Sequence, residues 1–454
     1  MTWVKGQIGS RLLAALGGLI VAAAVLALPA PAGAVWTAPK YISPQFIPAD
    51  KPPDVDMDAD GDSYFVYGLG DGRVQARKYT PTGALAGTST LTPRPTNPAI
   101  SPPGTDLHTV AVNGAGDSAY AWLTENQAKT RFILRARTRS ASGVLGPLMT
   151  IAELNNAEWK IEQPEVAVDA DGDAVVSWTE LATLGGRGEI KGRAVSKTGV
   201  LGSTQTISSN QQTASAKLGQ VEIQPDGDAV FAWEHSLPNL EGQVQTRTLR
   251  PDDTLTPIRE VSSFDSTYPD LAMAPDGDMI FAWQHADPFA GGHNVQARRM
   301  SEAGTLGRTF NLSPRGGEAS EAEIALNAAG AAAVVYASKD ALSGKTTIKG
   351  RTLSAADQLG KTHPLSGNSV EAPTEPQVGI SSAGRVVFSW LHHAPAVERL
   401  QSKTLTPAGA LGTLKTVASA PGLFGPRLAV APTGQAAAVW QDPEVKRIEA
   451  AFGP

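Results

Sequence analysis

Short segments in which apolar and polar residues alternate recur along this chain, and each group of segments contains a glycine followed six residues later by an aromatic residue. The eight groups lie about 50 to 56 residues apart. In every group an aliphatic residue or methionine stands six and four residues before the glycine, which is the alternation of a half-buried strand. The segment that ends on the aromatic residue is apolar on both faces, so we expect it to lie between neighbouring sheets. The glycine–aromatic pairs are Gly61/Tyr67, Gly116/Trp122, Gly172/Trp178, Gly227/Trp233, Gly277/Trp283, Gly330/Tyr336, Gly384/Trp390 and Gly434/Trp440.

The third group, residues 164–208, illustrates the repeating unit. It has four segments of strand length, separated by turn signals such as Asp-Ala-Asp-Gly-Asp and Lys-Thr-Gly. Four short strands joined by turns form one antiparallel meander, the unit of a propeller blade, and a repeat of this length is typical of propellers, solenoids and arrays. The sequence therefore predicts an all-β fold, a single β-propeller with eight four-stranded blades, or with seven if one unit is displaced.

The last unit lacks a fourth strand, and a matching segment is found near the other end of the chain. In the complete units the fourth strand starts with leucine and has an aliphatic residue six positions later. Trp36 and Ile42 show the same spacing, and Ser43 follows them as a serine does in several other units. We therefore predict that residues 35–43 complete the last blade, which would leave no unpaired sheet edge.

The first 34 residues have the pattern of a secretory signal peptide. Lys5 and Arg11 precede an uncharged apolar run, and Ala32-Gly33-Ala34 supplies a small-residue cleavage pattern, so we predict cleavage after Ala34 and a propeller over residues 35–454. A membrane anchor is the alternative, because the apolar run approaches the length of a spanning helix. For the mature protein we expect a secreted, extracellular monomer without a membrane span.

Charge and cysteine content narrow the possible partners. The chain has a formal net charge of −6, and removal of the two cations Lys5 and Arg11 makes this −8. A mildly acidic balance argues against nucleic acid and anionic membranes as partners. The chain contains no cysteine, although an exported protein is permitted disulfides. Packing and backbone hydrogen bonds must therefore hold the fold together.

Over nearly all of residues 35–454 the repeat resembles that of the secreted bacterial β-propeller proteins. The Asp-Ala-Asp-Gly-Asp turn is superficially similar to the Asp boxes of sialidase-type propellers, but it links the first and second strands rather than the third and fourth. The aromatic residue follows the glycine by six positions, not by four as in the tryptophan docking motifs of quinoprotein propellers. The resemblance therefore implies the architecture and no functional residue.

We interpret most of the recurring residues as framework. The Asp-rich turns at residues 58–62 and 169–173 have the spacing of hard-cation loops, but other units carry Asn-Ala-Ala-Gly or Pro-Thr-Gly there, so we predict no metal and no cofactor. The repeated aromatic residues suit sugar platforms, yet their apolar strand favours a place in the core. An arginine on the third strand of six units is interpreted as a framework contact over an aromatic ring rather than as an anion-binding site.

The position two residues after the aromatic residue varies between units and is mostly polar. It falls where the second strand ends, on the rim that carries the variable loops, and binding residues usually lie on such loops. Isolated carboxylates at a channel mouth also serve in propeller glycosidases and lyases. The binding candidates at this rim are Glu180, His235, His285, His392 and Asp442, and Glu180 and Asp442 are also the candidate catalytic residues.

The sequence shows no Ser-His-Asp order, phosphate-binding loop, HExxH or CxxC motif. The leading hypothesis is therefore a secreted, non-catalytic propeller that binds an extracellular carbohydrate or protein through its variable rim. The alternative is an extracellular carbohydrate-active hydrolase or lyase that uses rim carboxylates. A third interpretation is a structural module of the cell envelope. Sequence reasoning thus favours a binding protein over an enzyme.

Overall fold

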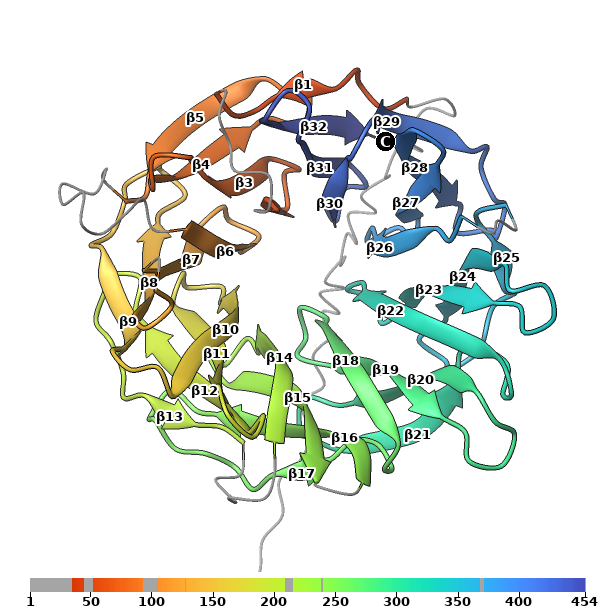
Figure 1. The fold of residues 1–454 in the computed structure, drawn as a ribbon, viewed down its shortest axis with the longest axis horizontal. Helices are drawn as coiled ribbons and strands as arrows, with labels where there is room; N and C mark the ends of the chain where they lie inside the picture. The colour runs from red at the N-terminus through yellow and green to blue at the C-terminus, as the bar shows by residue number, and fades with distance from the viewer. Residues whose placement is uncertain are drawn as a thin grey trace, which may run out of the picture.

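The computed structural model describes residues 35–44, 52–92, 104–126, 128–208, 215–237, 240–367 and 371–453. These residues form 32 strands and no helix, which confirms the predicted all-β class. Six sheets have four strands, and one has eight because a single parallel pair, His293 with Glu318, joins two four-stranded units. The sheets stand around a common axis, with the first strand of each unit innermost (Figure 1). The predicted signal peptide lies outside the described residues.

In most units four strands follow one another outward from the axis in sequence order. The innermost strands are β2 (Asp54–Met57), β6 (Gly104–Val112), β10 (Trp159–Val168), β14 (Ser215–Ile223), β18 (Ser266–Met273), β22 (Glu318–Leu326), β26 (Thr374–Ile380) and β30 (Phe424–Val430). The second strands are β3 (Ser63–Gly68), β7 (Ser118–Glu125), β11 (Ala174–Ala182), β15 (Ala229–Leu237), β19 (Met279–Ala286), β23 (Ala332–Lys339), β27 (Val386–Ala394) and β31 (Ala436–Asp442).

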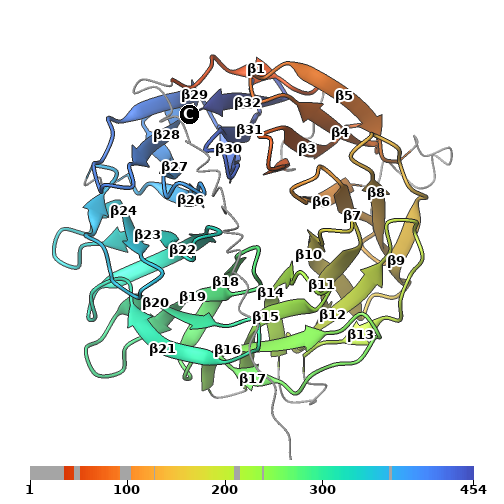
Figure 2. The same cartoon turned by 180° about the vertical axis from the view of Figure 1, so that it is seen from behind.

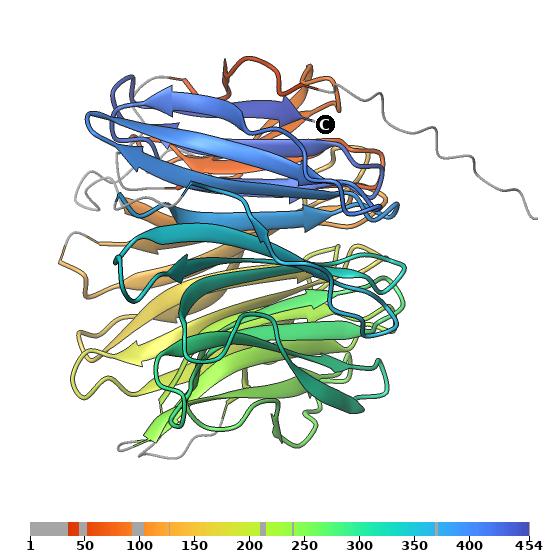
Figure 3. The same cartoon turned by 90° about the vertical axis from the view of Figure 1, so that its right-hand side faces the viewer.

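The outer half of each unit completes the meander, and the strands run between the two rims of the ring (Figure 3). The third strands are β4 (Val74–Tyr79), β8 (Phe132–Arg139), β12 (Gly188–Val195), β16 (Leu240–Leu249), β20 (His293–Met300), β24 (Thr346–Leu353), β28 (Val397–Leu405) and β32 (Arg447–Gly453). The outermost strands are β5 (Leu85–Thr90), β9 (Met149–Leu154), β13 (Gln205–Thr206), β17 (Arg259–Glu260), β21 (Leu306–Asn311), β25 (His363–Pro364), β29 (Lys415–Ala420) and β1 (Lys40–Tyr41).

The repeated aromatic residues fill the space between sheets, as predicted. Trp178 is 1% exposed, and Trp233, Trp283 and Trp390 are fully buried. Each packs in a cluster that joins two neighbouring units, for example Trp233 with residues of β10, β11, β14 and β15. An indole in such a place removes a large apolar area from water. These residues therefore belong to the framework and are not sugar platforms.

The repeated arginine is also framework, but its contact differs from the one expected. Arg193 Nε donates to Gly202 O at 2.8 Å in its own unit, and Arg193 Nη1 donates to Ile151 O at 2.8 Å in the preceding unit. The guanidinium thus bonds to main-chain carbonyls of two outer segments instead of covering an aromatic ring. The same pair of contacts is made by Arg137, Arg247, Arg298 and Arg351.

Three outermost strands in units with this arginine contact are only two residues long, although β9 and β21 have six residues beside the same contact. In the third unit an isolated bridge joins Val195 and Leu201, but the two-residue strand β13 starts only at Gln205. Between them the Gly202 carbonyl accepts from the side chain of Arg193 rather than from a main-chain N–H. The ladder is therefore interrupted, which also keeps the exposed edge short.

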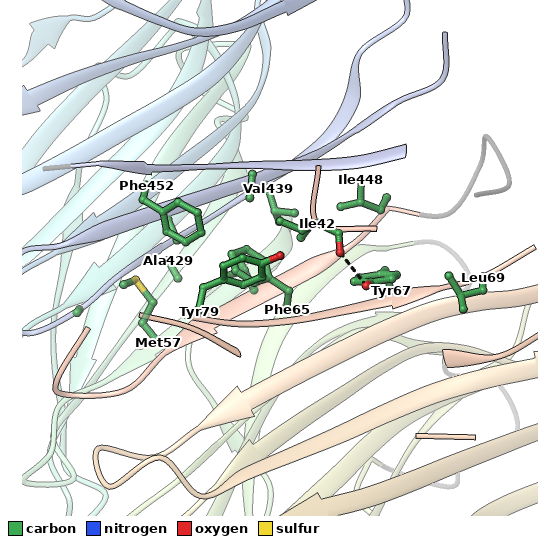
Figure 4. Packing of buried hydrophobic residues seen from close by; sticks show 14 residues of the cluster. Ile42, Met57, Phe65, Tyr67, Leu69, Tyr79, Ala429, Val439, Ile448 and Phe452 are labelled. Atoms are coloured by element: carbon green, nitrogen blue, oxygen red, sulfur yellow. Dashed lines mark hydrogen bonds between the residues drawn. The ribbon is translucent and has the colours of Figure 1, made fainter. Parts of the chain in front are cut away.

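Segments from opposite ends of the chain pair at one place in the ring. β1 is antiparallel to β32, with Lys40 opposite Ala450, and Ile42 N donates to Ile448 O at 2.9 Å. Ile42 is fully buried, and its carbonyl accepts from Tyr67 Oη at 2.8 Å (Figure 4). The N-terminal segment therefore contacts both the last and the first units of the chain.

This pairing predicts that Ile42→Ala will lower the free energy of unfolding by about 2–5 kcal/mol, because it leaves a cavity in a closed apolar cluster. Urea denaturation followed by tryptophan fluorescence measures the change. Val35→Ala is the control, since Val35 lies in the same segment but is 66% exposed. Equal stability of the two variants would contradict a structural role for the segment.

Candidate functional site

The strongest candidate site is formed by side chains of the inner strands, which surround the axis (Figure 2). The residue seven positions before each turn glycine is polar in all eight units, and all eight inner strands bring it to the same depth of the ring. These channel positions are Asp54, Thr109, Glu165, Gln220, Asp270, Glu323, Gln377 and Arg427.

Two cavities open among these residues. The larger has a volume of about 810 Å³ and is lined by Tyr268, Asp270, Glu321, Glu323 and Glu375, among others. The smaller, of about 280 Å³, lies beside Asp54, Thr109 and Gln163. Both cavities share Glu165, Gln220 and Arg427. The channel mouth is therefore one continuous polar site built from several units.

Burial and mutual repulsion favour the protonated form of several channel carboxyls. Burial raises the pKa of Glu165 to about 8, and the negative charge of Asp54 acts in the same direction. Burial likewise raises the pKa of Glu222, deeper in the channel, to about 8, with further contributions from Asp56 and Asp270. The pKa of Glu323 is raised well above its usual value, first by burial and then by Asp270. A pKa of about 8 favours the protonated form of Glu165 and Glu222 at neutral pH, and the shift of the Glu323 pKa acts in the same direction.

Asp270 differs from its neighbours because backbone donors stabilise its charge. Its two oxygens accept from Leu271 N at 2.9 Å and from Ile324 N at 2.7 Å. Burial still raises the pKa of Asp270 to about 6, and the two hydrogen bonds oppose that shift. Among the described residues, Glu165 accepts a single long hydrogen bond, from Thr109 Oγ1 at 3.5 Å. The site thus combines an ionised aspartate with a protonated glutamate at neutral pH.

Bulges in the inner strands shape the mouth of the larger cavity. A register shift precedes the channel position in β10, β18, β22 and β26, among other inner strands. In these four strands the bulged residue has a left-handed backbone although it is not glycine. The residues are Gln163 (φ 49°), Tyr268 (φ 53°), Glu321 (φ 52°) and Glu375 (φ 52°).

Such conformations are unfavourable for residues with a Cβ and are common at functional sites. Neighbouring units hold them in place: Glu375 N, for example, donates to Glu321 Oε2 at 3.0 Å. Tyr268, Glu321 and Glu375 line the larger cavity, and Gln163 lines the smaller. The bulges therefore turn one side chain per unit towards the channel mouth.

The five residues proposed from the sequence lie at this same rim, one strand further out. Antiparallel pairing puts Glu180 opposite Ile161 and His235 opposite Ala216, each four residues before a channel position. His285 lies opposite Ser266 and its Nδ1 is 3.3 Å from Ser266 Oγ. No hydrogen bond or ion pair joins any two of the five within the described residues, and none lines either cavity.

Several of these side chains already have local partners. Glu180 accepts from Trp178 Nε1 at 3.2 Å and lies 3.8 Å from Lys191 Nζ. Asp442 Oδ1 accepts from Glu444 N at 2.9 Å and so supports the turn that follows β31. Burial lowers the pKa of His235 and of His392, which favours neutral imidazole. Among the described residues no group of three or more His, Cys, Asp or Glu side chains is arranged to hold a metal ion.

The channel positions were not among the site residues predicted from the sequence, because the inner strand was interpreted from its small residues. The signal was present, since a polar residue recurs seven positions before every turn glycine. A proline follows the bulged residue directly in three of the four units discussed above, as Pro164, Pro269 and Pro376, and proline in a strand is typical of a bulge or an edge.

Comparisons with known proteins assign no family to this chain. No family model matches the chain, and no curated protein is similar in sequence. Among solved structures, an ulvan lyase bound to a saccharide aligns over 92% of this chain and 95% of its own at 10% identity and a TM-score of 0.49. A Penicillium chrysogenum α-L-arabinanase with arabinobiose aligns over 92% and 98% at 9% identity and a TM-score of 0.42. A Fusarium graminearum α-L-arabinofuranosidase with an iminosugar inhibitor aligns over 71% and 97% at 8% identity and a TM-score of 0.42. The chain is thus similar to β-propeller-like folds.

These comparisons contradict the sequence-based preference for a non-catalytic binding protein. The similar structures are mainly enzymes that act on carbohydrates, whereas the sequence-based preference was for a protein without catalytic activity. The preference was wrong because it relied on the absence of a catalytic motif in the sequence. Side chains that meet at the axis come from different units and are far apart in the sequence, as Glu165 and Asp270 are, so no local motif reveals them. The described residues also contain no helix that is long and apolar enough to cross a bilayer.

The channel carboxyls predict that stability falls as the pH rises from 5 to 8. Folding raises their pKa above the unfolded value, so the folded state binds more protons in this range and loses that advantage on deprotonation. Glu222→Gln should reduce the slope of unfolding free energy against pH by roughly 1 kcal/mol per pH unit. Urea titrations at several pH values measure the slope.

The exposed Glu158, outside the channel, provides the matched control as Glu158→Gln. That variant should keep the slope of the parent protein. If Glu222→Gln kept it too, Glu222 would not gain a proton on folding.

Proposed function

We propose that this protein is a secreted carbohydrate hydrolase whose active site is the larger channel cavity. The observation that carries the proposal is the pairing of a carboxyl that holds its proton near neutral pH, Glu165, with a carboxylate stabilised by two backbone donors, Asp270. The two residues line the same cavity from different units. Glycoside hydrolysis needs an acid and a second carboxylate on opposite sides of the scissile bond.

In this proposal the protonated Glu165 donates its proton to the glycosidic oxygen as the bond to the leaving sugar breaks. The ionised Asp270 faces the positive charge that develops on the sugar ring. Burial and then the charge of Asp270 raise the pKa of Glu323 well above its usual value, whereas two backbone donors stabilise the charge of Asp270. The negative charge of this pair therefore resides on Asp270.

The charge of the cavity favours a neutral glycan and thereby a hydrolase over a lyase. Arg427 is the only Lys, Arg or His side chain among the described residues that line the larger cavity, where it faces Glu165, Asp270, Glu321, Glu323 and Glu375. A lyase acting on a uronate must bind a carboxylate of its substrate, and the single arginine beside the ionised Asp270 leaves no net positive charge for a polyanion. The sugars of a neutral glycan offer hydroxyl groups to the same oxygen atoms and need no such charge.

The proposal includes the wider organisation predicted from the sequence. We propose a ring of eight blades, with residues 35–43 completing the last blade and residues 1–34 acting as a signal peptide. The pairing of β1 with β32 supports the closure. Secretion as a monomer that meets its substrate outside the cell remains part of the same proposal. The rim residues Glu180 and Asp442 are a second candidate location for the acid and base.

This function predicts that Glu165→Gln and Asp270→Asn each lower kcat/KM about 100-fold or more, because each removes a proton-transfer or charge-stabilising group. The assay is reducing-sugar release from arabinan, xylan, galactan and β-glucan. The rate should be bell-shaped in pH, falling below about 6 as Asp270 is protonated and above about 8 as Glu165 loses its proton.

Glu180→Gln and Asp442→Asn test the second location and should retain activity. If those two variants lose activity while Glu165→Gln keeps it, the site lies on the outer rim. Pectate and ulvan serve as polyanionic substrates, and formation of unsaturated products from them would indicate a lyase. Absence of product from every polysaccharide would contradict the proposed function.

A further inference from the structure

Tyr268 is the aromatic residue that lines the larger cavity, and its exposure to solvent differs from that of the aromatic residues between the sheets. Its side chain is 58% exposed, whereas Trp233 and Trp283 are fully buried. It stands on the bulge of β18, two residues before Asp270. Its hydroxyl group has no hydrogen-bond partner among the described residues. The ring and the hydroxyl are both available to a ligand in the cavity.

The backbone of Tyr268 is held in a conformation that disfavours a bulky side chain. Its φ of 53° lies in the left-handed region, where an aromatic residue is an outlier. Glycine would adopt this conformation without the steric cost of a Cβ. A tyrosine here therefore lowers stability relative to glycine, and stabilisation of the fold does not account for its presence.

A buried carboxylate from the neighbouring unit fixes this bulge. Tyr268 N donates to Glu234 Oε2 at 3.3 Å, and Glu234 is only 2% exposed. The other oxygen of Glu234 accepts from Ser236 Oγ at 3.1 Å and lies 3.1 Å from Lys217 Nζ. Pro269 follows Tyr268 directly and restricts the backbone further. The phenol ring of Tyr268 is therefore held by a preorganised backbone segment rather than by a mobile loop.

We propose that Tyr268 is a stacking platform for one sugar ring of a glycan chain whose scissile bond lies between Glu165 and Asp270. Sugars present an apolar C–H face and a polar edge, and the cavity offers an aromatic face beside carboxyl, amide and guanidinium groups. Glu234 acts as a positioning residue, since it touches the backbone of Tyr268 and not the cavity. The inference rests on the proposed function and names how that site holds its substrate.

Binding is best measured apart from catalysis, in a Glu165→Gln parent that cannot donate the proton. The probes are arabinohexaose, xylohexaose, galactohexaose and cellohexaose, titrated by calorimetry. Adding Tyr268→Ala should weaken the binding of whichever probe binds by about tenfold or more, while Tyr268→Phe should stay within about threefold. Phe289→Ala is the matched control, because Phe289 is 91% exposed near the same rim but lines neither cavity.

Thermal unfolding separates a binding role from a structural one. Tyr268→Gly removes both the ring and the backbone strain, so its melting temperature should equal or exceed that of the parent while its affinity falls. A residue kept for packing would lower both quantities. Glu234→Gln should weaken binding less than Tyr268→Ala, because the ring is retained but less well fixed.

Three outcomes overturn the inference. Binding of a probe with equal affinity by the parent and by Tyr268→Ala would reject the platform and leave the hydrolase proposal intact. A fall in melting temperature in Tyr268→Gly, together with unchanged affinity, would assign Tyr268 to the framework. Failure of the parent to bind any probe, combined with no hydrolysis by the wild-type protein, would reject both proposals.

Discussion

The hydrogen bonds that one arginine in each of five units donates to two outer segments hold successive sheets in register. The guanidinium is always charged and presents several donors in a fixed plane, so one side chain bonds to carbonyls of its own unit and of the preceding unit. Such charge-assisted bonds contribute more than neutral ones, about 1.5–3 kcal/mol each. In a chain without cysteine, these contacts and the apolar faces between sheets fix the spacing of the units. The inner strands can therefore bring side chains together at the axis with defined geometry.

The carboxylates at the axis fall into two groups, those that accept a hydrogen bond from the backbone of a neighbouring strand and those that do not. Asp54 Oδ2 accepts from Val110 N at 3.0 Å, and Asp56 Oδ2 accepts from Val112 N at 2.7 Å, so each aspartate ties its inner strand to the next. Asp270 makes the same contact with Ile324. Glutamate is longer by one methylene, and Glu222 has no such hydrogen bond in the described residues. These three aspartates therefore hold neighbouring strands together, whereas Glu165 and Glu222 lack such a backbone bond among the described residues.

The fold could be predicted from the sequence because its signals are local and repeated. A glycine at a tight turn and an indole six residues later recur in six units with the same structural meaning, and Trp178 is buried as expected. The candidate site could not be predicted in this way, because Glu165 and Asp270 line one cavity only through the arrangement of separate units. The raised pKa of Glu165 depends on enclosure by other units. The left-handed backbone of Tyr268 could not be predicted from the residue type, because tyrosine has no preference for that conformation.

At the bulges the side chain lines the channel mouth, and it does not belong to the core between the sheets. Bulged residues such as Tyr268, Glu321 and Glu375 contribute to the channel mouth from separate units, while their main chains are fixed by neighbouring carboxylates. Substitution at one such position changes the lining of the site without moving a turn or a core residue. Under the proposed hydrolase function, a few replacements at the bulged positions would change the substrate preference of the scaffold. The lining of the channel mouth can therefore vary in sequence while the core between the sheets stays constant.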